Sequence, residues 1–335
     1  MTSPVVAIAG LGEFGRIERF FRPLAVGVPG AFDLTDDAAV LDVPYDQQLV
    51  VTTDAMVSGV HFLPQDNPAD LGHKILAVNM SDLAAKGAEP LAYSLTTSLP
   101  KSIGDDWVEA FAKGLGEAQR EFKVNLAGGD SVSTSGPLSL TITALGLVPR
   151  NRMIRRKGAK LGDALFVTGS IGDAALGLKL ALGAPTQPVS DTDRAYLLSR
   201  LRRPTPRLDL VASLRVFGTA ALDVSDGLVA DLRHLALASK VRLQLDAQAV
   251  PMSGAALRLL LNTPSLRKAV LTGGDDYEIA FTAPADKAED IAAAGINAGI
   301  KVTRIGKVIE GEPGLDVLGL EGAEADLGTG GWRHF

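Results

Sequence analysis

The chain has 335 residues, which is enough for two ordinary domains with full cores. Its 46% hydrophobic content favours a compact α/β protein, and its net charge of −6 makes nucleic acid an unfavourable partner. An anionic ligand would therefore need help from placed Arg and Lys side chains or from bound metal. The absence of Cys excludes disulfides, thiolate metal sites and a cysteine nucleophile, and with only four His a histidine-held zinc or iron is disfavoured.

The N-terminus has no basic flank followed by a long apolar run, so no signal peptide is expected. No stretch of the sequence reaches the length of a transmembrane helix. The sequence therefore predicts a cytoplasmic protein that does not associate with membranes.

The first motif in the chain is Gly10-x-Gly12-x-x-Gly15, which has the form of a dinucleotide-binding fingerprint. That fingerprint needs a second strand ending in an acid about twenty residues on, and "RPLAVGVPGAF" supplies proline and glycines there. A dinucleotide-binding oxidoreductase stays open as an alternative on these three glycines alone. The other interpretation is a flexible N-terminal tail that runs into a first helix.

The next stretch, "DLTDDAAVL", places Asp36 and Asp37 side by side with no basic residue to relieve their repulsion. A turn would explain such a pair, because Asp favours turns. After it, hydrophobic periodicity predicts strands over 49–56, 91–100 and 138–149, and helices over 73–88 and 106–122.

A basic, proline-containing segment at 149–157 indicates a domain boundary, which predicts domains over 1–149 and 150–335. Beyond it the pattern changes to strand–turn–helix units at 163–182 and 220–239. Further strands are predicted at 241–247, 269–283 and 301–311, with a polar surface loop at 185–193. The fold class predicted from these elements is two α/β domains with mixed sheets.

Carboxylates recur where a strand ends or a turn begins, among small residues such as Gly, Ala and Ser. The set is Asp36, Asp37, Asp54, Asp82, Asp130, Asp223, Asp226, Asp275 and Asp276. Hard cations take oxygen ligands, and Mg²⁺ in particular is held by a few carboxylates together with waters and substrate phosphates. The sequence contains no GxxxxGK[ST] loop, so the pattern predicts a metal–phosphate site of another kind.

These residues carry a family likeness. In order, "DDAAVL", "TTDAMVSGVHF", "NMSDLAAKGA", "GGDSV", "RRKGAKLGDALFVTGSIGDAALGL", "LDVSDGL" and "GGDDYEIAFT" resemble the motifs of the thiamine-monophosphate kinase family. The termini "GEFGRIERFF" and "GGWRHF" are similar to those of the family as well. The wider superfamily includes aminoimidazole ribonucleotide synthetase and selenophosphate synthetase.

The resemblance implies an N-terminal domain that binds ATP and Mg²⁺ and pairs across a two-fold axis into a barrel-like core, with a C-terminal α/β domain beside it. It also implies a homodimer that transfers the γ-phosphoryl group of ATP directly onto thiamine monophosphate, with several Mg²⁺ ions, in the synthesis of thiamine diphosphate. Because the acceptor is itself a phosphate, such a reaction needs positioning and charge neutralisation more than a general base.

The resemblance also assigns site residues. Metal-binding positions are Asp37, Thr52, Thr53, Asp54, Asp82, Asp130, Asp223 and Asp226, and nucleotide-contacting positions are Gly129, Asp130, Arg156 and Ser225. Substrate-contacting positions are His61, Asp275 and Trp332. Asp54, Asp82, Asp130 and Arg156 are the residues expected to carry the chemistry, with Arg156 aiding charge stabilisation.

The chain departs from the family pattern at several places. Asp33-Leu34-Thr35 stands where the family usually has Gly-Ile-Gly, and Asp275 replaces a longer Glu. Lys86 stands where the family often has Met, and it is expected at the surface.

Two other functions stay open beside the kinase and the oxidoreductase. An aminoimidazole ribonucleotide synthetase-like enzyme is the alternative within the superfamily, although "GVHF" and "GWRHF" argue against it. The non-enzymatic alternative is a module that only binds Mg²⁺ or a nucleotide. The large number of carboxylates in the motifs argues against this alternative.

Overall fold

A computed structural model of the chain describes residues 11–184, 188–320, 327 and 331. The contacts divide the chain into two compact units that alternate along the sequence. Unit 1 comprises residues 1–42, 53–76 and 90–145, and unit 2 comprises residues 43–52, 77–89 and 146–335. Strand β1 (Gln47–Val57) and helix α2 (Pro68–Ala85) therefore each contribute residues to both units.

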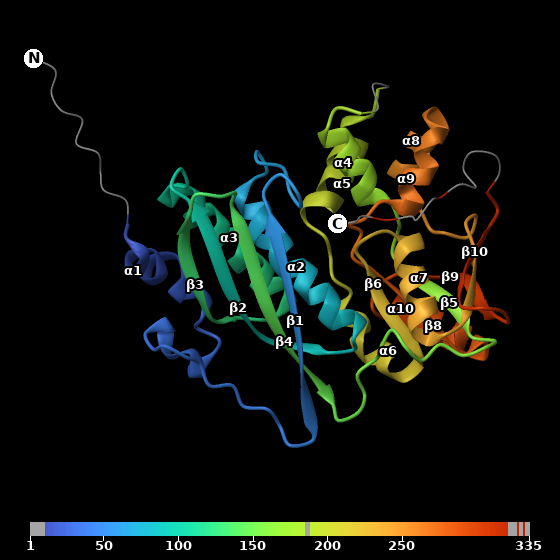
Figure 1. Cartoon of the computed structure of the whole chain (residues 1–335), viewed down its shortest axis with the longest axis horizontal. Coiled ribbons are helices and arrows are strands. Elements are labelled where there is room, and N and C mark those ends of the chain that lie inside the picture. The colour runs from blue at the N-terminus through green and yellow to red at the C-terminus, as the bar shows by residue number, and fades with distance from the viewer. Residues whose placement is uncertain (1–10, 185–187, 321–326, 328–330, 332–335) are drawn as a thin grey trace, which may run out of the picture. The chain divides into compact units, whose positions relative to one another are not determined.

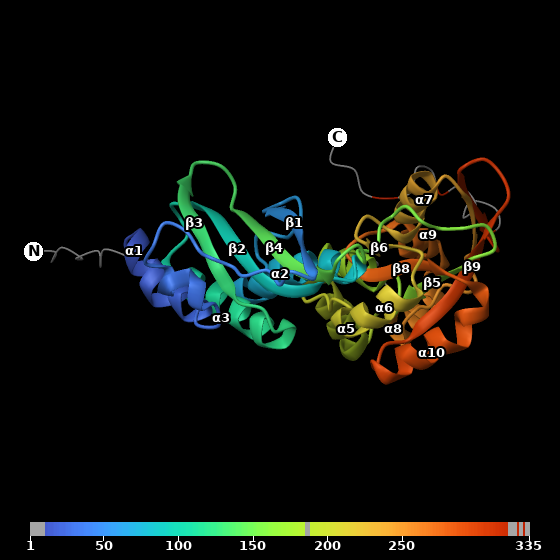
Figure 2. The ribbon, with the colours of Figure 1, turned by 90° about the horizontal axis from the view of Figure 1, so that it is seen from below.

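The four-stranded sheet has the strand order β1-β4-β2-β3. Its other strands are β2 (Glu89–Pro100), β3 (Leu126–Thr134) and β4 (Ser139–Pro149), and β2 pairs with β3 in parallel. Along β4 the side chains are alternately buried and partly exposed, which is the pattern of a sheet with one covered face. Helix α3 (Asp105–Phe122) lies on that sheet in both views (Figures 1 and 2), and it buries Val108, Phe111 and Leu115.

A helical N-terminal segment precedes this sheet. Helix α1 (Glu13–Arg16) continues into the π-helix η1 (Ile17–Phe21) and the 3₁₀-helix η2 (Arg22–Leu24), and the 3₁₀-helix η3 (Pro29–Leu34) follows. Phe20, Phe21 and Leu24 are buried. The predicted first helix is thus observed.

The second sheet has six strands in the order β10-β7-β9-β5-β8-β6. The strands are β5 (Ala164–Thr168), β6 (Ala220–Val224), β7 (Arg242–Asp246), β8 (Glu278–Ala283), β9 (Val302–Ile309) and β10 (Gly314–Leu318). Only the β10–β7 pair is parallel among the pairings of this sheet, so the sheet is mixed.

Helices cover both faces of the six-stranded sheet. They are α4 (Asp173–Ala181), α5 (Asp191–Arg202), α6 (Val211–Phe217), α7 (Leu228–Ser239), α8 (Gly254–Asn262), α9 (Arg267–Thr272) and α10 (Ala288–Asn297), with short 3₁₀ turns at Leu208–Leu210, Pro264–Leu266 and Ala285–Lys287. In β5, Leu165 and Val167 join one apolar core while Ala164 and Phe166 join the other. Since alternate residues of a strand face opposite ways, β5 is buried on both sides.

The predicted class of mixed α/β with two sheets is confirmed. The strand predicted over 269–283 is wrong in its first half, because residues to Thr272 belong to α9 and β8 begins only at Glu278. Between them the backbone turns, and Asp275 and Tyr277 have φ values of 71° and 50°. The loop predicted over 185–193 also ends early, since Ser190 caps α5 by accepting a hydrogen bond from the Asp193 N–H at 3.1 Å. Among the described residues, no helix is long and apolar enough to cross a membrane.

Candidate functional site

The residues predicted to form the site fall in both units. Unit 1 holds Asp37, Thr53, Asp54, His61, Gly129 and Asp130, and unit 2 holds Thr52, Asp82, Arg156, Asp223, Ser225, Asp226 and Asp275. Trp332 lies outside the described residues.

In unit 1 the acidic pair follows η3. Asp36 and Asp37 are exposed, and the Asp37 N–H donates a hydrogen bond to the Asp36 carboxylate at 2.7 Å. The backbone bends at this pair, and bends and turns are positions that Asp favours.

Two strands carry the other unit 1 positions. Asp54 lies inside β1 rather than at its end, and the neighbouring Thr53 hydroxyl lies 3.0 Å from the hydroxyl of Thr143. In β3, a Cβ on Gly129 would stand 2.0 Å from the backbone oxygen of Leu95, so only glycine fits there. Asp130 follows it and is exposed.

His61 lies after β1 and is partly buried. Its Nδ1 accepts a hydrogen bond from the Val57 N–H at 3.0 Å, which fixes the ring orientation and requires that Nδ1 carry no proton.

In unit 2, α2 and β6 bring two carboxylates of the predicted metal set together. Asp82 lies near the end of α2 and accepts a hydrogen bond from the Thr52 hydroxyl, and Asp223 lies near the end of β6, 5% exposed. Burial raises the pKa of Asp223 well above its usual range, and the charge of Asp82 raises it further. The Ser81 hydroxyl donates to Asp223 and partly offsets this effect.

The Lys86 ammonium lies near this pair of carboxylates. Lys86, in the turn after α2, donates from Nζ to the carbonyl oxygen of Ala221 at 2.8 Å. It is partly buried, so the expectation that it lies at the surface is wrong. Desolvation lowers the pKa of Lys86 to about 8, against the opposing charges of Asp223 and Asp82.

The loop after β6 is held by the helix that follows it. The Asp231 carboxylate of α7 accepts hydrogen bonds from the N–H groups of Ser225, Asp226 and Gly227, at 3.1, 3.1 and 3.2 Å. Burial raises the pKa of Asp231 to about 7, and the nearby charge of Asp226 contributes to the rise. Gly227 has a φ of +119°, and a Cβ there would lie 2.6 Å from the Thr272 oxygen, so this sharp loop requires glycine.

The same loop also orders the segment that leads into β8. The Asp275 N–H donates to the Ser225 oxygen at 2.8 Å, and the Tyr277 hydroxyl donates to the Asp275 carboxylate at 3.3 Å. Asp275 is thereby fixed beside Ser225, so the predicted nucleotide-contacting and substrate-contacting positions adjoin one another within unit 2.

Arg156 is exposed, and its charge acts on both Lys86 and Asp231, so it lies near the same cluster. Its backbone oxygen accepts a hydrogen bond from the Ser239 hydroxyl at 2.8 Å, which anchors the basic segment to the end of α7. Within unit 2, the structure therefore gathers Asp82, Asp223, Asp226 and Arg156 around the ends of β6 and α2.

The donor chemistry of this cluster fits Mg²⁺. Its donors are carboxylate and hydroxyl oxygens, the ligands that hard cations prefer, and one carboxylate is buried beside another of like charge. Among the described residues, no group of three or more His, Cys, Asp or Glu side chains is arranged to hold a metal by itself. The cluster is thus suited to a cation that takes its remaining ligands from phosphate and water.

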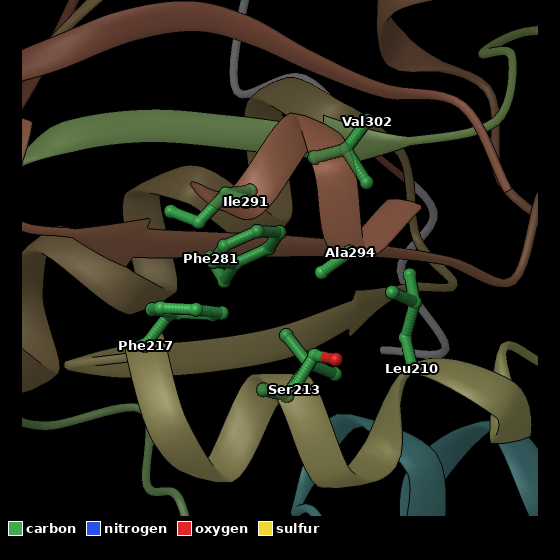
Figure 3. Close-up of a pocket in the computed structure, with 8 residues that line it drawn as sticks. Leu210, Ser213, Phe217, Phe281, Ile291, Ala294 and Val302 are labelled. Atoms are coloured by element: carbon green, nitrogen blue, oxygen red, sulfur yellow. The ribbon is translucent and has the colours of Figure 1, made fainter. Parts of the chain in front are cut away.

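Two other features do not fit a phosphate site. An apolar pocket between α6, β8 and α10 is lined by uncharged residues, among them Phe217, Phe281, Ile291 and Val302 (Figure 3). In the glycine motif, Gly12 precedes a helix of only four residues, and Gly10 lies outside the described residues. The first described strand begins only at Gln47, so the strand expected to follow the fingerprint is absent from residues 16–46.

Sequence reasoning missed Asp231 and misplaced Lys86. The spacing of Asp231, four residues after the N-cap residue Gly227, is a usable signal because acids in the first turn of a helix bind free N–H groups. For Lys86 the sequence offered no such signal, since its partner Ala221 is distant in the chain and contributes a backbone atom.

Comparisons with known proteins show the family of the chain. The chain matches the sequence models of the AIR synthase related protein N-terminal domain over residues 35–148 and C-terminal domain over residues 160–317. It is 43% identical to the thiamine-monophosphate kinase of Caulobacter vibrioides over 325 residues, which covers 96% of this chain and 90% of the relative.

Two solved structures are similar. The crystal structure of thiamine-monophosphate kinase from Stenotrophomonas maltophilia K279a has a TM-score of 0.79 at 44% identity, covering 85% of this chain and 90% of that one. AaThiL complexed with AMPPCP and TMP has a TM-score of 0.77 at 32% identity, covering 97% of both chains. The chain belongs to the thiamine-monophosphate kinase family.

Proposed function

We propose that this protein transfers the γ-phosphoryl group of ATP onto thiamine monophosphate, giving thiamine diphosphate and ADP. The observation that carries the proposal is the grouping of Asp82 and Asp223 with the Thr52 hydroxyl, in a chain that belongs to this family. The structure of AaThiL with AMPPCP and TMP supports both substrates by relationship.

The proposed metal ligands are Asp37, Thr52, Thr53, Asp54, Asp82, Asp130, Asp223 and Asp226. Bound Mg²⁺ would supply charge neutralisation between two phosphate groups and a template for in-line transfer. Asp231 contributes indirectly, because its three hydrogen bonds hold the loop that carries Ser225 and Asp226.

Around the metal ligands, Gly129, Asp130, Arg156 and Ser225 are the proposed nucleotide contacts. Arg156 would stabilise charge that develops on the transferred group. His61, Asp275 and Trp332 are the proposed contacts to thiamine monophosphate. No side chain needs to act as a general base, since a phosphate oxygen is already nucleophilic near neutral pH.

At the level of the whole protein, we propose a cytoplasmic homodimer with a nucleotide- and metal-binding domain over residues 1–149 and a second domain over 150–335. An aminoimidazole ribonucleotide synthetase-like reaction is not favoured, since the curated relatives are thiamine-monophosphate kinases. The oxidoreductase alternative is not favoured either, because Gly12 precedes only a four-residue helix.

The test is incubation with ATP, Mg²⁺ and thiamine monophosphate, followed by detection of thiamine diphosphate. We expect Asp82→Asn to lower turnover by at least about a hundredfold, because loss of one charge removes contacts to bound cations. Asp290→Asn on α10 is the control, since it removes an acid from an exposed helical pair with Lys287. Near-normal turnover of folded Asp82→Asn at saturating Mg²⁺ would refute the metal assignment.

A further inference from the structure

Lys86 is held in a fixed position beside the acidic cluster. Its Nζ donates to the Ala221 oxygen at 2.8 Å, two residues before Asp223 on β6. Its own backbone oxygen accepts a hydrogen bond from the Ile154 N–H at 3.1 Å. Both ends of the residue are therefore tied to unit 2, which limits how far the ammonium can move.

The charged groups around Lys86 are two acids and one base. Asp223 and Asp82 attract the ammonium, and Arg156 repels it. Asp223 also faces Asp231. The Lys86 ammonium is thus a cation built into the part of the cluster where a divalent ion would find its carboxylate ligands.

A fixed cation beside such ligands opposes the binding of a second cation. The repulsion between one unit charge and a divalent ion at side-chain separation in a hydrated site corresponds to about a tenfold change in affinity. A metal that arrives bound to a triphosphate brings excess negative charge with it, and for that complex the same ammonium is not repulsive.

We propose that Lys86 weakens the binding of free Mg²⁺ at Asp82 and Asp223, so that the metal is retained there chiefly together with nucleotide phosphates. The inference rests on the proposed function, because it takes these two carboxylates as metal ligands. In this role Lys86 is a positioning residue that sets metal affinity. The alternative is a purely structural role, in which its hydrogen bond only holds the end of α2 to β6.

The experiment is calorimetric titration of MgCl₂ into the nucleotide-free full-length protein at pH 7 and constant ionic strength. We expect Lys86→Met to bind Mg²⁺ about tenfold more tightly than the unmodified chain, because it keeps side-chain length and removes the charge. Lys86→Arg should retain the weaker affinity. Lys287→Met is the matched control, since it makes the same change in net charge next to Asp290 on another helix, α10.

A second neutral variant guards against a folding defect. Lys86→Gln keeps a hydrogen-bond donor for the Ala221 oxygen, so it should also bind Mg²⁺ more tightly even if Lys86→Met unfolds. An unchanged or weaker Mg²⁺ affinity in the folded neutral variants would overturn the inference. So would an increase of the same size in Lys287→Met, because the effect would then reflect net charge alone.

The proposed metal site is tested separately by Asp82→Asn in the same titration. If Mg²⁺ binding is lost in Asp82→Asn yet unchanged in Lys86→Met, the metal site stands and the inference on Lys86 fails. If Asp82→Asn binds Mg²⁺ as the unmodified chain does, the metal assignment itself fails.

Discussion

Three consecutive residues before the acidic pair have a backbone conformation that suits glycine. Phe32, Asp33 and Leu34 have φ values of 49°, 56° and 57°. For an L-residue this left-handed region costs roughly 1–2 kcal/mol. Asp tolerates it better than Phe or Leu because its short side chain can bond locally. Of the two positions where the family resemblance implies glycine, Asp33 therefore lies in this left-handed region, whereas Thr35 has a φ of −105°.

Substitution of Phe32 measures this strain. We expect Phe32→Gly to be more stable than Phe32→Ala by roughly 1 kcal/mol, the reverse of the usual order, because only glycine adopts this φ without a Cβ penalty. Phe32 is 48% exposed, so both variants lose the same ring contacts. Chemical denaturation of the two proteins gives the difference.

Val40 provides the comparison for Phe32. It is 62% exposed and lies in a segment of unit 1 without regular secondary structure, and its φ is not positive. There Val40→Ala should be at least as stable as Val40→Gly. If Ala were also the more stable choice at position 32, the strain we infer would be absent.

At the scale of single residues, the sequence singles out acids but not their partners. Small neighbours mark Asp82 within α2, and a strand end marks Asp223. The position of Lys86 could not, since its partner is a backbone oxygen of Ala221 that only the fold brings close. Nor does a sequence show that burial shifts the pKa of Asp223, which depends on packing around the end of β6.

Among the elements, the N-terminal segment bonds to Asp105 at the start of α3. Asp105 accepts hydrogen bonds from the Leu11 N–H and from Arg16 Nε, both at 2.7 Å. These bonds hold the pKa of Asp105 below its usual value of 3.8, and the bond from the Leu11 N–H has the larger effect. The attachment is consequently complete above that pH and is lost as the pH falls below it.

We expect Asp105→Asn to loosen this segment without unfolding the protein. Amide exchange over residues 11–21 should become faster, whereas exchange in the strands of the six-stranded sheet should not change. Mass-spectrometric hydrogen exchange near neutral pH measures both. Glu109→Gln is the control, because Glu109 faces Arg19 at 3.9 Å and both side chains are about 60% exposed. Equal exchange in Asp105→Asn and Glu109→Gln would show that the bond is not what holds the segment.

A buried carboxylate joins three other elements. Glu278 at the start of β8 is 0% exposed, and it accepts hydrogen bonds from Arg200 at 2.9 Å, from Arg207 Nε at 2.6 Å and from the Thr168 hydroxyl at 2.7 Å. A Cβ on residue 169 would lie 2.1 Å from the Glu278 carboxylate. The carboxylate therefore fits beside this turn only because residue 169 is glycine. The network fixes β5, α5 and the segment before α6 to the strand that follows Asp275.

We expect Glu278→Gln to lower the free energy of unfolding by about 3–5 kcal/mol, because it leaves two mostly buried guanidinium groups without a counter-charge. Asp316→Asn is the control, since its bond to Arg242 joins side chains that are 33% and 35% exposed and should contribute at most about 1 kcal/mol. Urea denaturation measures both. A loss in Glu278→Gln no larger than that in Asp316→Asn would refute the structural importance of the network.

The regular elements could be predicted where hydrophobic periodicity is strong. The strand predicted over 138–149 matches β4 (Ser139–Pro149), and the helix predicted over 106–122 matches α3. The continuous strand predicted over 269–283 failed because the apolar residues Val270 and Leu271 are buried in a helix, and periodicity cannot distinguish short buried helices from strands. Helix α5 was missed because its Arg- and Ser-rich surface hides the buried Leu197 and Leu201.

For the whole molecule, the two units do not correspond to two continuous halves of the sequence. Unit 2 takes residues 43–52 and 77–89 in addition to everything after 145. Sequence patterns follow the chain, so a single boundary near 149 could be predicted while this alternation could not. The position of Thr52 and Asp82 in the same unit as Asp223 is the part of the site that depends on it.

Ligand binding should stabilise the whole molecule in proportion to its affinity. ATP with Mg²⁺ at about a hundred times its dissociation constant should contribute about 2.7 kcal/mol to the free energy of unfolding, which raises the melting temperature by several degrees. NAD and NADP at the same concentration should have no effect, because the glycine motif at Gly12 leads into a four-residue helix rather than a nucleotide fold. Differential scanning fluorimetry measures the shifts, and Asp82→Asn should lose most of the shift that Mg²⁺ adds to ATP.

Gly12→Ala should leave the shift produced by ATP with Mg²⁺ unchanged, since a Cβ at this position meets no other atom within 4 Å. Stabilisation by NAD that disappears in Gly12→Ala would instead support the dinucleotide-binding alternative and count against the kinase.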